Sequence, residues 1–138
     1  MDRTQLQQLA EVRIQDAEAL LAASRWGAAY YLLGYSVECA LKACVVKQFR
    51  LHEMPDKKLV NTFYTHRLDE LLTISGVKSE LEARAETDSV FAINWNTVRD
   101  WSETLRYELG VTEALAKGMY EAVTNGATGI LPWLRTQW

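Results

Sequence analysis

Apolar residues recur every three or four positions along most of the chain, and this spacing is typical of amphipathic helices. A stripe that includes Leu6, Leu9 and Leu20 predicts a first helix over residues 4–24. Residues 26–51 predict a second helix whose first half has no polar face, so we expect it at the centre of a bundle. The pattern therefore predicts an all-α protein in which one apolar helix is covered on several sides.

The chain between the second helix and Gly76 carries a weaker signal. Residues 52–65 contain a proline and show no sustained period, so we expect the longest loop there. A short helix is predicted over residues 66–75, because leucines again face one side. Gly76 suits the left-handed conformation that often ends a helix, so it is the expected C-terminal cap.

Two further helices are predicted in the C-terminal half. Ser79 and Glu82 match a capping box, which begins a helix that continues to about residue 101. Thr112 is a favoured N-cap residue for a last helix that runs toward the C-terminus. Glycines and a proline weaken its last part, so a kink or a short terminal turn is expected near Ile130.

The chain has 138 residues, which fits a single domain over residues 1–138 with a core that needs no disulfide or metal. Cys39 and Cys44 would point about 140° apart on the second helix, so they are interpreted as reduced, buried thiols. The N-terminus has no charged region leading into an apolar stretch, so no secretory signal is expected. These features predict a cytoplasmic protein.

The formal net charge is −3, from 15 basic and 18 acidic side chains. This balance gives no overall attraction to nucleic acid or to anionic lipid, so any such binding must be local. Residues 26–46 are long enough to span a bilayer, but Glu38 and Lys42 would each be costly to insert. We therefore expect a soluble core helix and no membrane association.

The most unusual feature of the second helix is a charge pair in an apolar setting. Glu38 and Lys42 lie one turn apart, about 40° around the helix axis, in the order that favours an ion pair. Buried helices carry such groups where they satisfy each other or serve a site. Two interpretations stay open: the pair closes the margin of the core or a subunit interface, or it belongs to a binding site.

A second polar cluster would form if the helix that ends near residue 101 continued. Arg99, Arg106 and Tyr107 would then share a face with Glu103, and two guanidinium groups suit a phosphate. The alternative is a solvated surface ladder in which Arg99 and Glu103 form an ordinary exposed pair. The candidate ligand-binding residues are thus Arg99, Arg106, Tyr107, Glu38 and Lys42.

No recognised catalytic or metal-binding motif accompanies these candidates. His52 and His66 have no partner at catalytic or metal-ligand spacing, so they are interpreted as structural or solvated histidines. The sequence contains no glycine-rich phosphate loop, no HExxH motif and no CxxC motif. Accordingly, no catalytic residue is assigned, and neither a metal nor a cofactor is predicted.

Three segments, in this order, make the chain resemble the HEPN domain, a compact helical module of prokaryotic toxin–antitoxin and defence systems. They are RWGAAYYLLGYSVECALKA at residues 25–43, THRL at residues 65–68, and the segment from Trp101 to Arg106 and Tyr107. The resemblance covers most of the chain. It implies an up-and-down bundle of four to five helices, a homodimer with a polar cleft at the subunit interface, and a partner that is commonly a minimal nucleotidyltransferase.

The chain departs from the HEPN pattern at the residues that would cleave RNA. Active HEPN ribonucleases carry an arginine followed four to six residues later by a histidine, and neither Arg99 nor Arg106 is followed by one. Cleavage through the ribose 2′-hydroxyl needs a group that moves protons near neutral pH, which arginine does not do. Tyr107 is a poor substitute, because a phenol ordinarily loses its proton only at high pH.

The sequence therefore predicts a HEPN-like domain that binds a nucleotide or RNA phosphate, a partner protein, or both, within a toxin–antitoxin or defence unit. In this hypothesis Arg99 and Arg106 bind phosphate, Tyr107 stacks or hydrogen-bonds, and Glu38 with Lys42 orders the floor of the cleft. Two alternatives are retained. One is a divergent metal-independent ribonuclease toxin that uses Arg106, Tyr107 and Glu38; the other is a non-catalytic dimerisation module.

Overall fold

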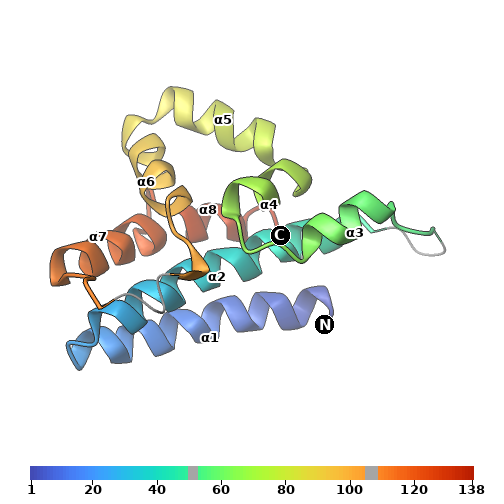
Figure 1. Cartoon of the computed structure of the whole chain (residues 1–138). Helices are drawn as coiled ribbons and strands as arrows, with labels where there is room; N and C mark the ends of the chain where they lie inside the picture. Colours follow the sequence, from blue (N-terminus) through green and yellow to red (C-terminus); the bar gives the residue numbers. More distant parts are fainter. Residues whose placement is uncertain (50–52, 105–108) are drawn as a thin grey trace.

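The computed structural model describes residues 1–49, 53–104 and 109–138, and all regular secondary structure within these ranges is helical (Figure 1). The prediction of an all-α protein is therefore confirmed for the described residues. The helices are α1 (Arg3–Ala22), α2 (Trp26–Lys47), α3 (Lys57–Phe63), α4 (Leu68–Ile74), α5 (Lys78–Thr87), α6 (Ser89–Arg99), α7 (Glu113–Thr124) and α8 (Ile130–Arg135).

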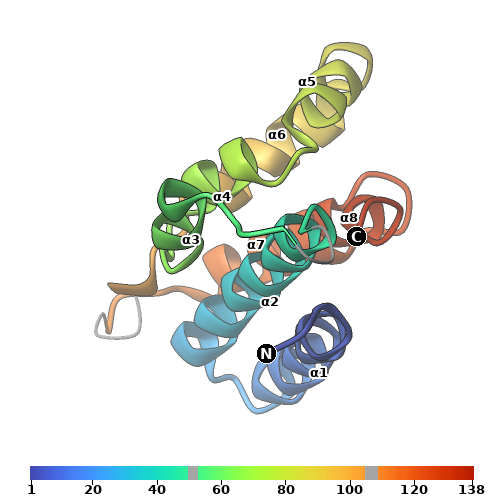
Figure 2. The same cartoon turned by 90° about the vertical axis from the view of Figure 1, so that its right-hand side faces the viewer.

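The long helix α2 lies at the centre of the molecule, as its apolar sequence predicts. It runs alongside α1 over most of its length and also contacts α4, α7 and α8 (Figures 1 and 2). Leu33, Val37 and Leu41 are fully buried along it. The Ser36 hydroxyl donates a 2.8 Å hydrogen bond to the Ala10 carbonyl of α1, so a buried polar contact fixes how the two helices meet.

By length and composition alone, α2 could cross a membrane. Of its most apolar window, 67% is buried inside the bundle, which is the behaviour of the core helix of a soluble protein. The burial of Glu38 within this helix fits a core position as well, because its charge is met by partners inside the protein.

The stretch expected to be the longest loop contains a helix. Helix α3 begins after Asp56, whose carboxylate accepts hydrogen bonds from the backbone N–H groups of Lys58 and Leu59. None of its residues is fully buried, so the sequence of α3 has no apolar period that would predict a helix. Helix α2 ends at Lys47, and residues 50–52, which include His52, lie outside the described residues.

Helix α4 lies within the range predicted for it, and Gly76 follows with φ +81°, which confirms the predicted left-handed cap. The single helix predicted from the Ser79–Glu82 capping box to residue 101 is wrong. It is two helices, α5 and α6, and Val77 precedes α5 without any side-chain cap. Asp88 breaks the run, because it adopts an extended backbone and its carboxylate caps α6 at the Phe91 N–H.

The last predicted helix is also divided. The Thr112 hydroxyl accepts from the Leu115 N–H at the start of α7, as predicted. Asn125 then turns the chain, because its side-chain oxygen accepts from the N–H groups of Ala127 and Thr128. Helix α8 begins at Ile130, which confirms the expected terminal turn. The described residues thus form eight helices, and the predicted count of four to five is too low.

Candidate functional site

Among the described residues, Glu38 is the charged one that the core encloses most completely. It is 1% exposed on the buried part of α2. Lys42 donates from Nζ to Glu38 Oε1 at 2.9 Å, which confirms the predicted ion pair. The Lys42 ammonium group also lies 5.3 Å from the centroid of the Phe63 ring at the end of α3. The pair therefore links the central helix to the segment that precedes α4.

His66 is the second partner of Glu38. Its Nδ1 lies 2.9 Å from the same Oε1 atom, and its side chain is half exposed. When the Glu38 carboxylate is ionised it only accepts hydrogen bonds, so Nδ1 is then the donor, and the other ring nitrogen is directed away from Glu38. The sequence offered His66 no partner at catalytic or metal-ligand spacing, and the structure supplies one from α2, 28 residues away.

Spacing along the sequence could not reveal this contact, because Glu38 and His66 are 28 residues apart, with Glu38 on α2 and His66 in the connection between α3 and α4. The only sequence signal was that both residues lie in stretches that carry the HEPN resemblance. Only the folded structure brings His66, at the start of a predicted helix, against the middle of a core helix.

Two buried polar atoms in this region have no hydrogen-bond partner within the described part of the chain. They are Glu38 Oε2 and the indole nitrogen Nε1 of Trp101. Buried polar groups are almost always hydrogen-bonded in folded proteins, so such atoms mark positions worth attention as binding sites. Glu38 thus keeps one oxygen uncommitted while the other accepts from both Lys42 and His66.

Trp101 follows α6 and packs directly on α2. A Cβ atom placed on Gly34 would lie 2.2 Å from the Trp101 indole, so only glycine allows the ring this close to the helix. Tyr31, one turn earlier on α2, has its ring centroid 5.8 Å from that of Trp101. This packing holds the segment after α6 against the helix that carries Glu38.

A pocket of about 330 Å³ lies between the start of α4 and the end of α6. We call it the His66 pocket. Arg67, which lines it, is already paired with Asp69 at 3.2 Å, whereas the Arg99 side chain makes no hydrogen bond or ion pair with any described residue. The residues that line it are His66, Arg67, Leu68, Asp69, Arg99, Asp100, Trp101, Ser102 and Glu103.

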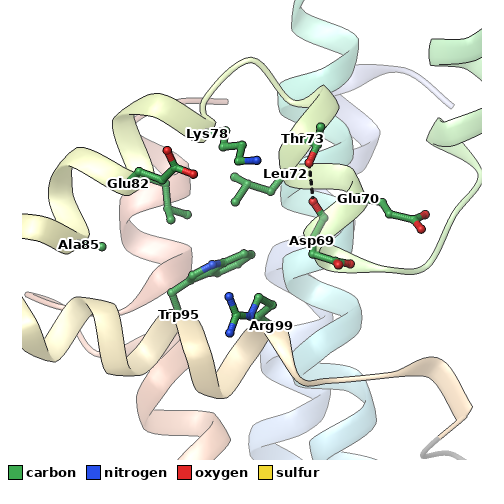
Figure 3. Close-up of a pocket in the computed structure, with 10 residues that line it drawn as sticks. Asp69, Glu70, Leu72, Thr73, Lys78, Glu82, Ala85, Trp95 and Arg99 are labelled. Atoms are coloured by element: carbon green, nitrogen blue, oxygen red, sulfur yellow. Dashed lines mark hydrogen bonds between the residues drawn. The ribbon is translucent and has the colours of Figure 1, made fainter.

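A second pocket, of about 400 Å³, adjoins the first and shares Asp69 and Arg99 with it. We call it the Trp95 pocket. It lies among α4, α5 and α6, with Trp95 and Arg99 along one side and α5 on the other (Figure 3). Arg99 therefore stands between two cavities, which the sequence did not predict.

The predicted site residues are only partly brought together. Glu38 and Lys42 form a pair, and Glu38 also contacts His66, which lines the His66 pocket. Arg99 lines that pocket, and no ion pair joins it to Glu103, so the predicted surface ladder does not form between these two residues. Arg106 and Tyr107 lie outside the described residues.

The two cysteines are free and buried, as predicted. Burial raises the pKa of the Cys39 thiol to about 11, and the negative charge of Glu38 adds to the rise. Burial likewise raises the pKa of Cys44 to about 11. Neither thiol is a nucleophile near neutral pH, so the polar chemistry of this region belongs to Glu38, His66 and Arg99.

Within residues 1–49, 53–104 and 109–138, no group of three His, Cys, Asp or Glu side chains could hold a metal ion. No family model, no curated protein and no solved structure matches the chain. The two pockets, and the contacts of Glu38 with Lys42 and His66, are therefore the features that bear on function.

Proposed function

We propose that this chain is a HEPN-like domain that binds the phosphate group of a nucleotide or of RNA in the His66 pocket. The observation that carries the proposal is the state of Arg99. Its guanidinium lines the pocket and is not engaged by any described carboxylate, whereas Arg67 beside it is paired with Asp69. An arginine that is free of ion pairs can offer its planar donors to two phosphate oxygens.

In this proposal Glu38 and Lys42 support the His66 pocket without lining it. Glu38 accepts a hydrogen bond from His66 and so fixes the orientation of the imidazole that lines the pocket. Lys42 partly balances the buried charge of Glu38 at 2.9 Å. Arg106 and Tyr107 keep the roles assigned from the sequence, phosphate binding and stacking, as part of the proposal.

The mixed charge of the pocket limits the class of ligand. Three acidic residues, Asp69, Asp100 and Glu103, line it together with the basic ones. A polyanion spread over a wide surface would meet repulsion there, whereas one phosphate held at Arg99 would not. A nucleotide or the backbone of a short single strand of RNA therefore fits better than a long duplex.

The test is equilibrium binding of a short single-stranded RNA and of ribose 5-phosphate to the wild type and to Arg99→Gln. Hydrogen bonds to charged groups contribute about 1.5–3 kcal/mol, so Arg99→Gln should weaken binding about tenfold to hundredfold. Arg3→Gln is the matched control, because Arg3 is exposed on α1 and its side chain makes no hydrogen bond or ion pair with described residues. Equal affinities for the wild type and Arg99→Gln would exclude this site.

The Glu38–His66 contact favours a second candidate, a metal-independent ribonuclease. A carboxylate that holds an imidazole is an arrangement that moves protons. In such a reaction His66 would take the proton of a ribose 2′-hydroxyl, and the 2′-oxygen would form a bond to the adjacent phosphorus. The bond from phosphorus to the 5′-oxygen would break, and the 5′-oxygen would take its proton from solvent water. Arg99, with Arg106, would steady the charge on the phosphate.

Incubation of the protein with labelled single-stranded RNA in the presence of a chelator separates binding from cleavage. If products with 2′,3′-cyclic phosphate ends form and His66→Gln abolishes them, the chain is a ribonuclease. If RNA is bound and stays intact, the binding function alone stands. Toxicity on expression in cells, lost with the same substitution, would support the ribonuclease as a toxin.

We further propose that the protein acts in the cytoplasm as a homodimer, paired with a minimal nucleotidyltransferase in a toxin–antitoxin or defence unit. The support is the HEPN resemblance of residues 25–43 and 65–68. Sedimentation of the purified protein tests the dimer, and a nucleotidyltransferase reading frame next to its gene, followed by co-purification, tests the partner. A monomer that captures no such enzyme would overturn this part.

A further inference from the structure

The Trp95 pocket has an aromatic floor and polar groups that no described residue engages. Leu72, Leu81 and Trp95 supply its apolar lining, and Trp95 is only 7% exposed, so its ring is held in place by the core. Lys78 and Glu82 face the same space from α5, opposite Trp95 and Arg99 of α6 (Figure 3). A fixed ring beside free hydrogen-bonding groups is typical of a small-molecule site.

Lys78 and Glu82 are one turn apart on α5 and yet do not form an ion pair. Neither side chain makes a hydrogen bond or ion pair with any described residue. By contrast, Lys117 and Glu113, at the same separation on α7, are paired. The Trp95 pocket therefore presents a donor-only ammonium group and an acceptor-only carboxylate that are both available to a ligand.

Helix α6 offers a second pair of groups on one face. Trp95 and Arg99 are four residues apart, so their side chains start about 5–6 Å from each other. A nucleotide likewise carries a flat base and a phosphate that are separated by a single sugar. Arg99 also lines the His66 pocket, so a ligand bound at Arg99 can extend from that pocket into the Trp95 pocket.

We propose that the Trp95 pocket is the base subsite for the nucleotide whose phosphate binds at Arg99, and that the preferred base is guanine. This inference rests on the function proposed above for the His66 pocket. Guanine carries a carbonyl oxygen next to two N–H donor positions on one edge. Lys78 donates to the carbonyl, Glu82 accepts from the N–H groups, and Trp95 supports the ring.

Adenine, cytosine and uracil match this arrangement less well. Adenine and cytosine each present one amino group, so Glu82 would accept at a single position. Uracil has one ring N–H between two carbonyl groups, and one of those carbonyls would lie near the carboxylate. The pocket therefore predicts a preference among bases, which a site that recognises phosphate alone would not have.

Calorimetric titration of the wild-type chain with GMP, AMP, UMP, guanosine and ribose 5-phosphate tests the inference. A bidentate base contact contributes about 1–3 kcal/mol, so GMP should bind about tenfold more tightly than AMP, UMP or ribose 5-phosphate. Glu82→Gln should remove most of that preference and leave ribose 5-phosphate binding unchanged. Glu86→Gln, an exposed carboxylate on the same helix outside the pocket lining, is the matched control.

The outcomes separate the two proposals. If GMP and ribose 5-phosphate bind equally and Arg99→Gln weakens both, the base subsite is wrong and the phosphate site stands. If guanosine binds, Glu82→Gln abolishes its binding and ribose 5-phosphate does not bind, the base subsite stands and the phosphate proposal is wrong. If no nucleotide or nucleoside binds, or Glu82→Gln has no effect on GMP, the base subsite is overturned.

Discussion

The charged side chains of α2 and of α5 differ in whether they have partners within the described protein. On α2, Glu38 is buried and its Oε1 atom accepts from both Lys42 and His66. On α5, Leu81 is the only residue fully buried, and Lys78 and Glu82 face a pocket without partners among the described residues. Substitutions on α2 should therefore cost stability, whereas substitutions on the pocket side of α5 should change binding alone.

The largest expected effect is in the core of α2. Leu41→Ala removes a fully buried side chain and leaves a cavity, so we expect the free energy of unfolding to fall by about 2–5 kcal/mol. Urea denaturation followed by circular dichroism measures the change. Leu115→Ala on the exposed face of α7 is the control and should stay within about 0.5 kcal/mol of the wild type. Similar losses for both would contradict a core centred on α2.

The next largest effects on stability are expected at two glycines, Gly34 on α2 and Gly118 on α7. Gly34→Ala would drive a methyl group into the Trp101 ring, so stability should fall by about 1–3 kcal/mol. Gly118→Ala meets nothing within 4 Å on α7 and should instead stabilise the protein by about 0.5–1 kcal/mol. Thermal unfolding of the two variants measures both signs, and a neutral Gly34→Ala would show that Trp101 does not pack closely on α2.

On the pocket side of α5 the effect should be on ligand affinity. Lys78→Met removes a donor that has no partner in the described protein, so the free energy of unfolding should change by less than about 0.5 kcal/mol. GMP affinity should fall by up to about tenfold, because the lost Lys78 contact is part of the base preference. Lys58→Met on α3, outside the pocket lining, should leave both quantities unchanged. A loss of stability in Lys78→Met without a loss of GMP affinity would show that Lys78 supports the fold and not the binding of a ligand.

The smallest expected effect is at the junction of α5 and α6, and it depends on pH. The hydrogen bond from the Phe91 N–H lowers the pKa of Asp88 below 3.8. A lowered folded-state pKa contributes stability above pH 3.8, and that contribution is lost as the pH falls through the folded-state value. Asp88→Asn keeps an N-cap acceptor and should remove this dependence, so acid unfolding of the variant should begin less steeply. Identical acid profiles would show that Asp88 is not held by the cap.

Local patterns in the sequence predicted much of the core and little of the pockets. The period of α1 and α2 and the pairing of Glu38 with Lys42 depend on residues within a turn or two of each other, so they could be read directly. Asp88 and Asn125 divided two predicted helices, because a single capping side chain can end an apolar period that otherwise continues.

The candidate site was predicted in part, for a physical reason. Arg99 was selected from the sequence as a candidate phosphate ligand, and the structure places it on the lining of both pockets, but the cavities on either side of it are formed by α4, α5 and α6 together. Such cavities depend on how helices pack, which residue spacing within one helix does not specify. The contact between Glu38 and His66 was missed for the same reason.

The central claim is that the His66 pocket binds phosphate at Arg99, and backbone amide NMR during a titration with ribose 5-phosphate tests it most directly. We predict that saturable chemical-shift changes concentrate at residues 66–69 and 99–103, around the pocket, and are absent from the first two turns of α1. They should disappear in Arg99→Gln and persist in Arg3→Gln. Shift changes confined to other parts of the protein, or equally strong in Arg99→Gln, would contradict the account.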